Sequence, residues 1–162
     1  MNFYENLEDA MKNLTTRGAF LTVKNNQGVN TMTISWGYIG FSWNKPYFVA
    51  MVRPQRYTYE FLKTAKDYTI SIPYSDGMKK ALTICGTKSG KDIDKAKEAN
   101  IKFLNSKTVS SPIVDNCNIY YECKITYVDR IKKDKFPDEL KKNYPIDDYH
   151  FLYYGEIVDC YN

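Results

Sequence analysis

The fold is decided by residues 30–58, NTMTISWGYIGFSWNKPYFVAMVRPQRYT. At its start, hydroxyl-bearing and apolar side chains alternate up to Trp36, and this period of two predicts a β-strand. Tyr47–Val52 (YFVAMV) is a continuous apolar run, as expected of a strand buried on both faces. Arg53–Thr58 (RPQRYT) follows as a turn into a short helix. The stretch therefore predicts a β-rich core with a cationic turn at one strand end.

The segments on either side extend this pattern of strands. Ala19–Lys24 and Val29–Trp36 flank Asn-Asn-Gln-Gly, a turn in which glycine can adopt a positive φ, so they predict a hairpin. Further strands are predicted at Asp67–Ile72, Asn118–Val128 and Phe151–Cys160. Helical spacing of apolar residues predicts helices at Asn2–Leu14, Tyr57–Thr64, Gly77–Ile84 and Lys91–Asn100, the first with Asn2 and Glu5 as a capping box.

The order of these elements argues against a Rossmann domain, since there is no βαβαβ rhythm and neither GxGxxG nor GxxxxGK[ST] occurs. A closed or partly closed antiparallel barrel is the better architecture. The charged stretch Lys132–Asn143, which contains Pro137, is predicted to leave the barrel as an excursion. The length of 162 residues predicts one domain, residues 1–162.

Composition excludes some classes of function. The net charge is +4, but acidic and basic residues interleave instead of forming the stripe typical of a nucleic-acid binder. No apolar run approaches the ~20 residues that span a bilayer. We therefore expect neither a nucleic-acid nor a membrane partner. Four cysteines without a CxxC pair indicate free thiols and a cytoplasmic location, and no residues are spaced as metal ligands.

Three segments could carry chemistry, and each also has a purely structural interpretation. The hydroxyls of Thr31, Thr33 and Ser35 share one strand face, which is either an ordinary outer face or the lining of a slot for a polar heterocycle. Arg53 and Arg56 form either an exposed helix cap or an anion site, because arginine can hold a phosphate with two hydrogen bonds. Residues 85–95, CGTKSGKDIDK, are either a loop between helices or a close backbone approach to a ligand.

The three segments together resemble one family. An N-x-M-T-I-S-W-G strand from Asn30, an R-P-x-R-Y-T turn from Arg53 and a C-G-x-x-S-G-x-x-x-D-K segment from Cys85 follow the order and spacing of the flavin reductase-like, FMN-binding split-barrel family, near its flavoredoxin branch. The resemblance covers about residues 10–160. It implies a mostly β fold, a six-stranded antiparallel split β-barrel that forms a homodimer and holds FMN near the subunit interface.

The resemblance also implies roles for individual residues. Met32, Thr33 and Ser35 would border the isoalloxazine ring. The ribityl phosphate would be held by four residues of the turn, Arg53, Arg56, Tyr57 and Thr58. Three residues of the later segment, Ser89, Gly90 and Lys95, would close the site. Trp36 shares the Met32 and Ile34 face of its strand, which predicts a core position rather than one beside the ring.

His150 is the only histidine, and two interpretations stay open. A lone histidine is most often a surface or structural residue. Its segment, H-F-L-Y-Y-G-E-I, nevertheless resembles the H-x-x-x-x-G segment of flavin reductases, in which the histidine lies near flavin and nicotinamide. On that resemblance His150 is the candidate catalytic residue.

The resemblance implies an FMN-dependent oxidoreductase, an NAD(P)H:flavin reductase-like enzyme that passes electrons through N5 of FMN with NADH or NADPH as donor. A first alternative is an FMN-bound electron carrier, reduced by a redox protein. A more distant alternative is a non-enzymatic barrel that binds another ligand or a nucleic acid.

Overall fold

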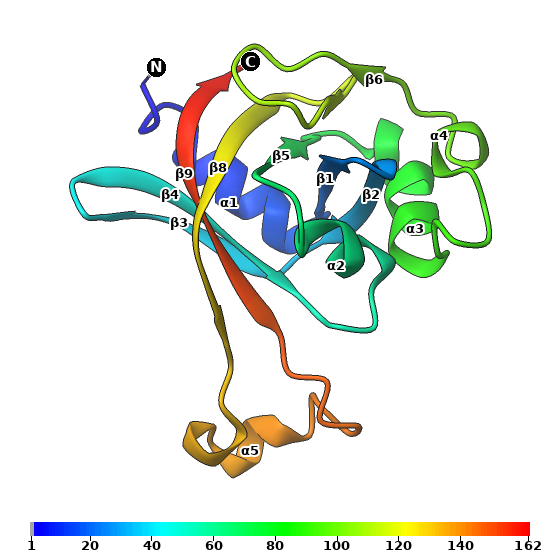
Figure 1. Cartoon of the computed structure of the whole chain (residues 1–162). Helices are drawn as coiled ribbons and strands as arrows, with labels where there is room; N and C mark the ends of the chain where they lie inside the picture. The colour runs from blue at the N-terminus through cyan, green and yellow to red at the C-terminus, as the bar shows by residue number, and fades with distance from the viewer. Residues whose placement is uncertain (1) are drawn as a thin grey trace.

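The computed structural model describes residues 2–162 and is built around one curled antiparallel sheet (Figure 1). Seven strands form it in the order β2-β1-β5-β8-β9-β4-β3, and every pairing is antiparallel. Their bounds are β1 Ala19–Asn25, β2 Gly28–Ile34, β3 Gly37–Ser42, β4 Lys45–Val52, β5 Asp67–Ile72, β8 Ile119–Arg130 and β9 Phe151–Tyr161. The consecutive strands β2 and β3 are thus the two edges of the sheet, which makes the barrel a split one.

The helices are short, and all but the last lie close to the sheet (Figure 1). They are α1 Leu7–Thr16, α2 Tyr57–Leu62, α3 Lys79–Thr87, α4 Lys95–Glu98 and α5 Asp138–Lys141, with 3₁₀ turns at Asp76–Met78 and Lys133–Lys135. The α2 helix packs on β1 and β2, and α3 packs on β2. A separate two-stranded sheet, β6 (Phe103–Leu104) with β7 (Ile113–Val114), lies over β5.

The hydrophobic core explains why buried and exposed residues do not alternate along β1. Its inward side chains, Leu21 and Val23, join the main cluster of the barrel together with Leu14 of α1. Its outward Phe20 joins a second cluster with Leu82 and Cys85 of α3. Because the helix covers the outer face, both faces of β1 are buried, which removes the polar positions of a half-exposed strand.

The predicted mostly β, split-barrel class is confirmed, but the strand count of six was too low. The missed strand is β3, which contains two glycines and has no buried residue along its length, so its sequence does not alternate. It pairs with β4 through a two-residue turn, Trp43–Asn44, with both residues at positive φ (51° and 58°). Compact hairpin turns of that type normally contain glycine or asparagine at both positions. Here tryptophan occupies the first position, so the sequence does not indicate the turn.

Three helix predictions need correction. The first helix is Leu7–Thr16, not Asn2–Leu14, and its cap residue Asn6 has a φ of 59°, so the predicted capping box does not form. The Gly77–Ile84 helix lies later, at Lys79–Thr87. Of Lys91–Asn100 only four residues are α-helical, because the Asp94 side chain accepts a hydrogen bond from the amide of Lys97 and starts the helix there.

The excursion is confirmed in position. Strands β8 and β9 run on together as a long arm, with α5 at its far end (Figure 1). We call residues 131–150 the arm segment. It carries Lys132–Asn143, as predicted, and it returns to the barrel at His150.

All four cysteines are free thiols, with Cys85 and Cys123 fully buried. Burial raises the pKa of the Cys85 thiol to about 11, so it is held in its unreactive protonated form. Within residues 2–162, no helix has the length and apolar character needed to cross a membrane.

Candidate functional site

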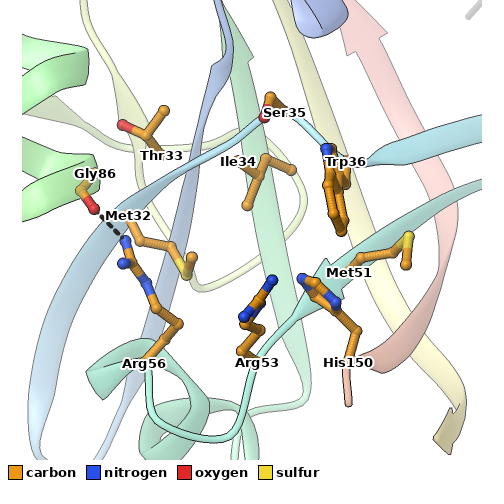
Figure 2. A pocket seen from close by; sticks show the side chains of 10 residues that line it. All are labelled: Met32, Thr33, Ile34, Ser35, Trp36, Met51, Arg53, Arg56, Gly86 and His150. Carbon is orange, nitrogen blue, oxygen red and sulfur yellow. Dashed lines mark hydrogen bonds between the residues drawn. The ribbon is translucent and has the colours of Figure 1, made fainter. Parts of the chain in front are cut away.

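Two adjoining cavities lie between the β2 edge, the end of β4 and the start of the α4 region. The large cavity, of about 230 Å³, is lined by residues 32–36 of β2 and its exit, with Met51, Arg53, Arg56, Gly86 and His150 (Figure 2). The small cavity, of about 100 Å³, is lined by Met32, Gln55, Arg56, Tyr57, Thr58, Thr87, Lys88, Ser89 and Lys95. Met32 and Arg56 line both, so the two cavities form one elongated site.

Strand β2 supplies one wall, but two of its hydroxyls are already engaged. The Thr31 hydroxyl is buried and lies 3.0 Å from that of Thr22 on β1. Thr33 donates a hydrogen bond of 2.6 Å to the carbonyl of Leu82 on α3. Both therefore join β2 to its neighbours, whereas the hydroxyl of the exposed Ser35 makes no hydrogen bond within residues 2–162. Figure 2 shows Met32 turned toward the arginines, while Thr33 points away from them.

Two cations line the small cavity, and one of them, Arg56, also lines the large one. Arg56 donates a 2.7 Å hydrogen bond to the carbonyl of Gly86, which leaves most of its five N–H groups for other partners. Lys95 is buried, and its Nζ donates to the carbonyls of Thr31 (2.8 Å) and Cys85 (3.0 Å). An ammonium group has three donors, so one N–H remains for a ligand.

The electrostatics of these cations favour an anion. Burial, with the nearby Arg56, lowers the pKa of Lys95 to about 8 despite the opposing influence of Cys85. Burial and the charge of Arg53 also lower the pKa of Arg56. A bound anion would relieve both costs, because it compensates positive charge removed from water.

Arg53 lies at the other end, in the large cavity. Its Nη1 forms a 2.9 Å ion pair with the buried Asp148, and its Nη2 donates a 2.8 Å bond to the carbonyl of Asn143. Gln55 donates to the same oxygen of Asp148. Arg53 thus fastens the arm segment to the barrel, and it is separate from the small cavity in which Tyr57, Thr58, Ser89 and Lys95 gather.

A close contact joins the turn after α3 to β2. The Asn30 amide donates a 2.8 Å bond to the buried hydroxyl of Thr58. Gly90 packs directly on these residues, so an added Cβ would collide with Asn30 Oδ1 and come within 3.2 Å of the Tyr57 ring. Only glycine allows this approach, which holds Ser89 beside the small cavity.

His150 is buried in the wall of the large cavity. Its Nδ1 lies 2.7 Å from the hydroxyl of Tyr144, and its ring lies 5.2 Å from that of Trp36. Burial and the charge of Arg53 lower its pKa to about 4, so the imidazole is neutral near pH 7. Trp36 was predicted to be a core residue, and this was wrong, because it is 44% exposed at the cavity mouth. Trp36 lies two residues beyond Ile34, the last residue of β2, so its side chain no longer follows the alternation between the two faces of the strand.

The structure gathers most of the predicted site residues around the two cavities. Met32, Thr33, Ser35, Arg53, Arg56 and His150 line the large one, and Tyr57, Thr58, Ser89 and Lys95 line the small one. Gly90 lines neither, but lies against Asn30. Sequence reasoning missed Gln55, Tyr144 and Asp148. The last two lie in the arm segment, roughly ninety residues along the chain from Arg53, and no local pattern marks them.

The elongated hollow has Arg56 and Lys95 at one end and aromatic and sulfur-containing side chains at the other, a combination that suits a planar ligand with an anionic tail. Residues 11–162 match the model of the flavin reductase like domain, and the chain belongs to that family. Membership supports a flavin-related redox role.

Solved structures share the fold. An FMN-binding protein from Thermus thermophilus, crystallised with 1-cyclohex-2-enone, aligns at 23% identity over 90% of this chain and 69% of its own, with a TM-score of 0.69. Flavoredoxin from Methanosarcina acetivorans aligns at 22% identity over 90% and 68%, also with a TM-score of 0.69. An NADH:FAD oxidoreductase from Streptomyces globisporus aligns at 15% identity over 90% and 75%, with a TM-score of 0.68.

The residues present fit FMN. The large cavity offers the open mouth, the Trp36 face and the polar groups that a tricyclic ring system needs. The small cavity offers Arg56, Lys95 and the hydroxyls of Thr58 and Ser89, which suit a phosphate. The unused N–H donor of Lys95 favours the same end for the phosphate.

Proposed function

We propose that this protein is an FMN-binding oxidoreductase of the flavin reductase type. The observation that carries the proposal is the pairing of two cations, the half-buried Arg56 and the buried Lys95, with a second cavity that is open and walled by Trp36. Phosphate at the first end and the ring at the second would place FMN along β2. When bound, FMN supplies the group that accepts and passes on electrons, through its N5.

The residues of the chain would bind and orient this cofactor. Arg56, Lys95, Thr58 and Ser89 would hold the phosphate, while Met32, Thr33 and Ser35 would lie along the ring. Arg53 and His150 would face the ring end, where positive charge and N–H donors stabilise a reduced, anionic flavin. Since His150 is neutral, it would act there as a hydrogen-bond partner and not as a second cation.

The identity of the electron donor distinguishes the two hypotheses, a flavin reductase and an electron carrier. The exposed ring of Trp36 at the large cavity would offer a planar donor a surface for stacking, and this favours NADH or NADPH. The alternative is an FMN-bound electron carrier, flavoredoxin-like, that receives electrons from a redox protein.

Titration of the purified protein with FMN is the first test. We expect saturable binding, a shifted flavin spectrum near ~450 nm and a rise in melting temperature, because a ligand that binds only the folded state stabilises it. Anaerobic addition of NADH or NADPH should then bleach the flavin. If FMN changes neither spectrum nor melting temperature, the proposal fails. If FMN binds but only a reduced redox protein bleaches it, the carrier replaces the enzyme.

We further propose that the protein is a homodimer, on the evidence of one exposed aromatic surface. Tyr38 on β3 and Tyr127 on β8 lie in one row across the sheet with Val49 and Tyr154 between them. Trp43 packs against Tyr154 with ring centroids 6.3 Å apart, and Trp43 is 66% exposed. Contiguous aromatic surface of this kind is typical of an interface.

Light scattering tests this surface. We expect a mass twice that of one chain, and a monomer after Trp43→Lys combined with Tyr127→Glu. Ile146→Lys changes a residue that is more exposed (74%) but lies outside this surface, so that variant should stay dimeric. A wild-type monomer at tens of micromolar would contradict the proposal.

A further inference from the structure

The contact between Tyr144 and His150 connects the arm segment to the large cavity. Both side chains are buried, and their polar atoms lie 2.7 Å apart. The tyrosine ring is itself fixed, since it stacks on Tyr149 at 4.5 Å and meets Phe136 edge-on at 5.6 Å. The guanidinium of Arg53 covers its face at 5.0 Å. The hydroxyl therefore meets the imidazole in one geometry.

The direction of this hydrogen bond follows from counting donors. Burial raises the pKa of Tyr144, so the phenol keeps its proton. Among residues 2–162, Nδ1 of His150 is the one hydrogen-bond partner of that hydroxyl. If Nδ1 carried a proton, the phenol proton would be buried without an acceptor, at a cost of about 1–3 kcal/mol. Tyr144 is therefore the donor, Nδ1 the acceptor, and the imidazole proton lies on Nε2.

Burial is the main cause of the lowered pKa of His150, and the two charged groups around the ring act on that pKa in opposite directions. Arg53 faces it from the end of β4, and its charge opposes a second proton. Asp148, from the arm segment, favours the proton, but its Oδ2 is engaged by Arg53 and Gln55. Trp36 contributes an aromatic face and no charge.

We propose that Tyr144 is a positioning residue: its hydroxyl fixes His150 as the Nε2–H tautomer, so that the imidazole offers the large cavity a hydrogen-bond donor and not an acceptor. The ligand group that this donor suits is an oxygen or an unprotonated ring nitrogen carrying negative charge. The inference deepens the proposed flavin function, because such atoms belong to a reduced flavin ring. It does not depend on flavin for its test.

The chain offers an unusually direct test, because His150 is the only histidine. A long-range ¹H–¹⁵N correlation spectrum of tag-free, flavin-free protein contains a single imidazole. We expect one protonated and one unprotonated nitrogen at pH 7, with the carbon couplings placing the proton on Nε2. The pattern should persist to pH 5, because the pKa of His150 lies near 4. A proton on Nδ1 in the wild-type protein overturns the inference.

The variant Tyr144→Phe removes only the hydroxyl. We expect its two nitrogen shifts to move toward each other, as the tautomers mix. Its imidazole pKa should rise, because the lost bond stabilised only the neutral ring. The matched control is Tyr149→Phe, since the Tyr149 hydroxyl is buried without a hydrogen-bond partner among the described residues. It should leave tautomer and pKa unchanged, and an equal shift in both variants would show that packing, not the bond, is responsible.

The outcomes separate this inference from the proposed function. If the protein does not bind FMN but shows the expected Nε2–H spectrum, only the proposed function is contradicted. FMN binding together with an Nδ1–H spectrum, or with a tautomer unchanged in Tyr144→Phe, defeats only the role of Tyr144.

Discussion

Replacing Gly155 with alanine should destabilise the fold by about 3 kcal/mol, the upper part of the range for overpacked cores. Gly155 lies on β9 opposite Phe48 of β4. A Cβ there would come within 2.6 Å of Tyr68 Cζ and 2.7 Å of Cys123 Cβ, inside the centre of the barrel. Tyr68 cannot yield easily, because its fully buried hydroxyl donates to the carbonyl of Phe48 and lies 3.1 Å from that of Tyr153.

Thermal and urea unfolding measure this cost, and a protein of this length should lose about 6–12 °C in melting temperature. Gly40→Ala is the matched control, since Gly40 lies in the edge strand β3 and a Cβ added to it would meet no atom within 4 Å. Its melting temperature should change by about 2 °C or less. Equal losses in the two variants would mean that backbone freedom, and not the collision with Tyr68, determines the effect.

The second large effect concerns phosphate binding. The double variant Arg56→Ala and Lys95→Met should weaken FMN binding by about a thousandfold, because hydrogen bonds to a charged group contribute about 1.5–3 kcal/mol each. Calorimetry or flavin fluorescence measures the dissociation constant. Lys91→Met is the control, since Lys91 precedes Lys95 by only four residues but lies over the Tyr57 ring and lines neither cavity. If Lys91→Met bound FMN as weakly as the double variant, the assignment of the phosphate to Arg56 and Lys95 would be contradicted.

The pH dependence of FMN binding follows from Lys95. Its pKa is lowered to about 8, so the free protein loses this charge as the pH rises through 8. The affinity for FMN should therefore fall between about pH 7.5 and 9.5 in the wild-type protein, and should depend less on pH in the double variant.

Arg53→Ala should lower the affinity less than Arg56→Ala, because Arg53 already pairs with Asp148 at the other end of the site.

Much of the fold was predictable because period and turn chemistry are local. The hairpin of β1 and β2, the buried β4, and β5 with its DYTISI alternation all follow from their own residues. The missed β3 is an edge strand with two glycines and no fully buried residue, so its sequence shows no clear alternation of apolar and polar side chains. The over-long helix at Lys91–Asn100 failed for a different reason, since Asp94 caps a helix inside it.

The site was predictable only in part. Arg56, Thr58 and Lys95 meet as expected, because three short motifs were recognisable in order. The arm segment was not, since Tyr144 and Asp148 reach the cavity through tertiary contacts with Arg53. Trp36 was misplaced because strand periodicity was extended two residues beyond the end of β2.

The split between β2 and β3 gives the barrel a seam that the chain itself leaves without hydrogen-bonded pairing. Both cavities lie beside one edge of this seam, between Met32 of β2 and Arg56, which follows β4. A cofactor held there would join β2 to the residues that follow β4, and its binding free energy would be added to the free energy of unfolding. Cofactor supply would thereby regulate the lifetime of the folded protein as well as its redox activity.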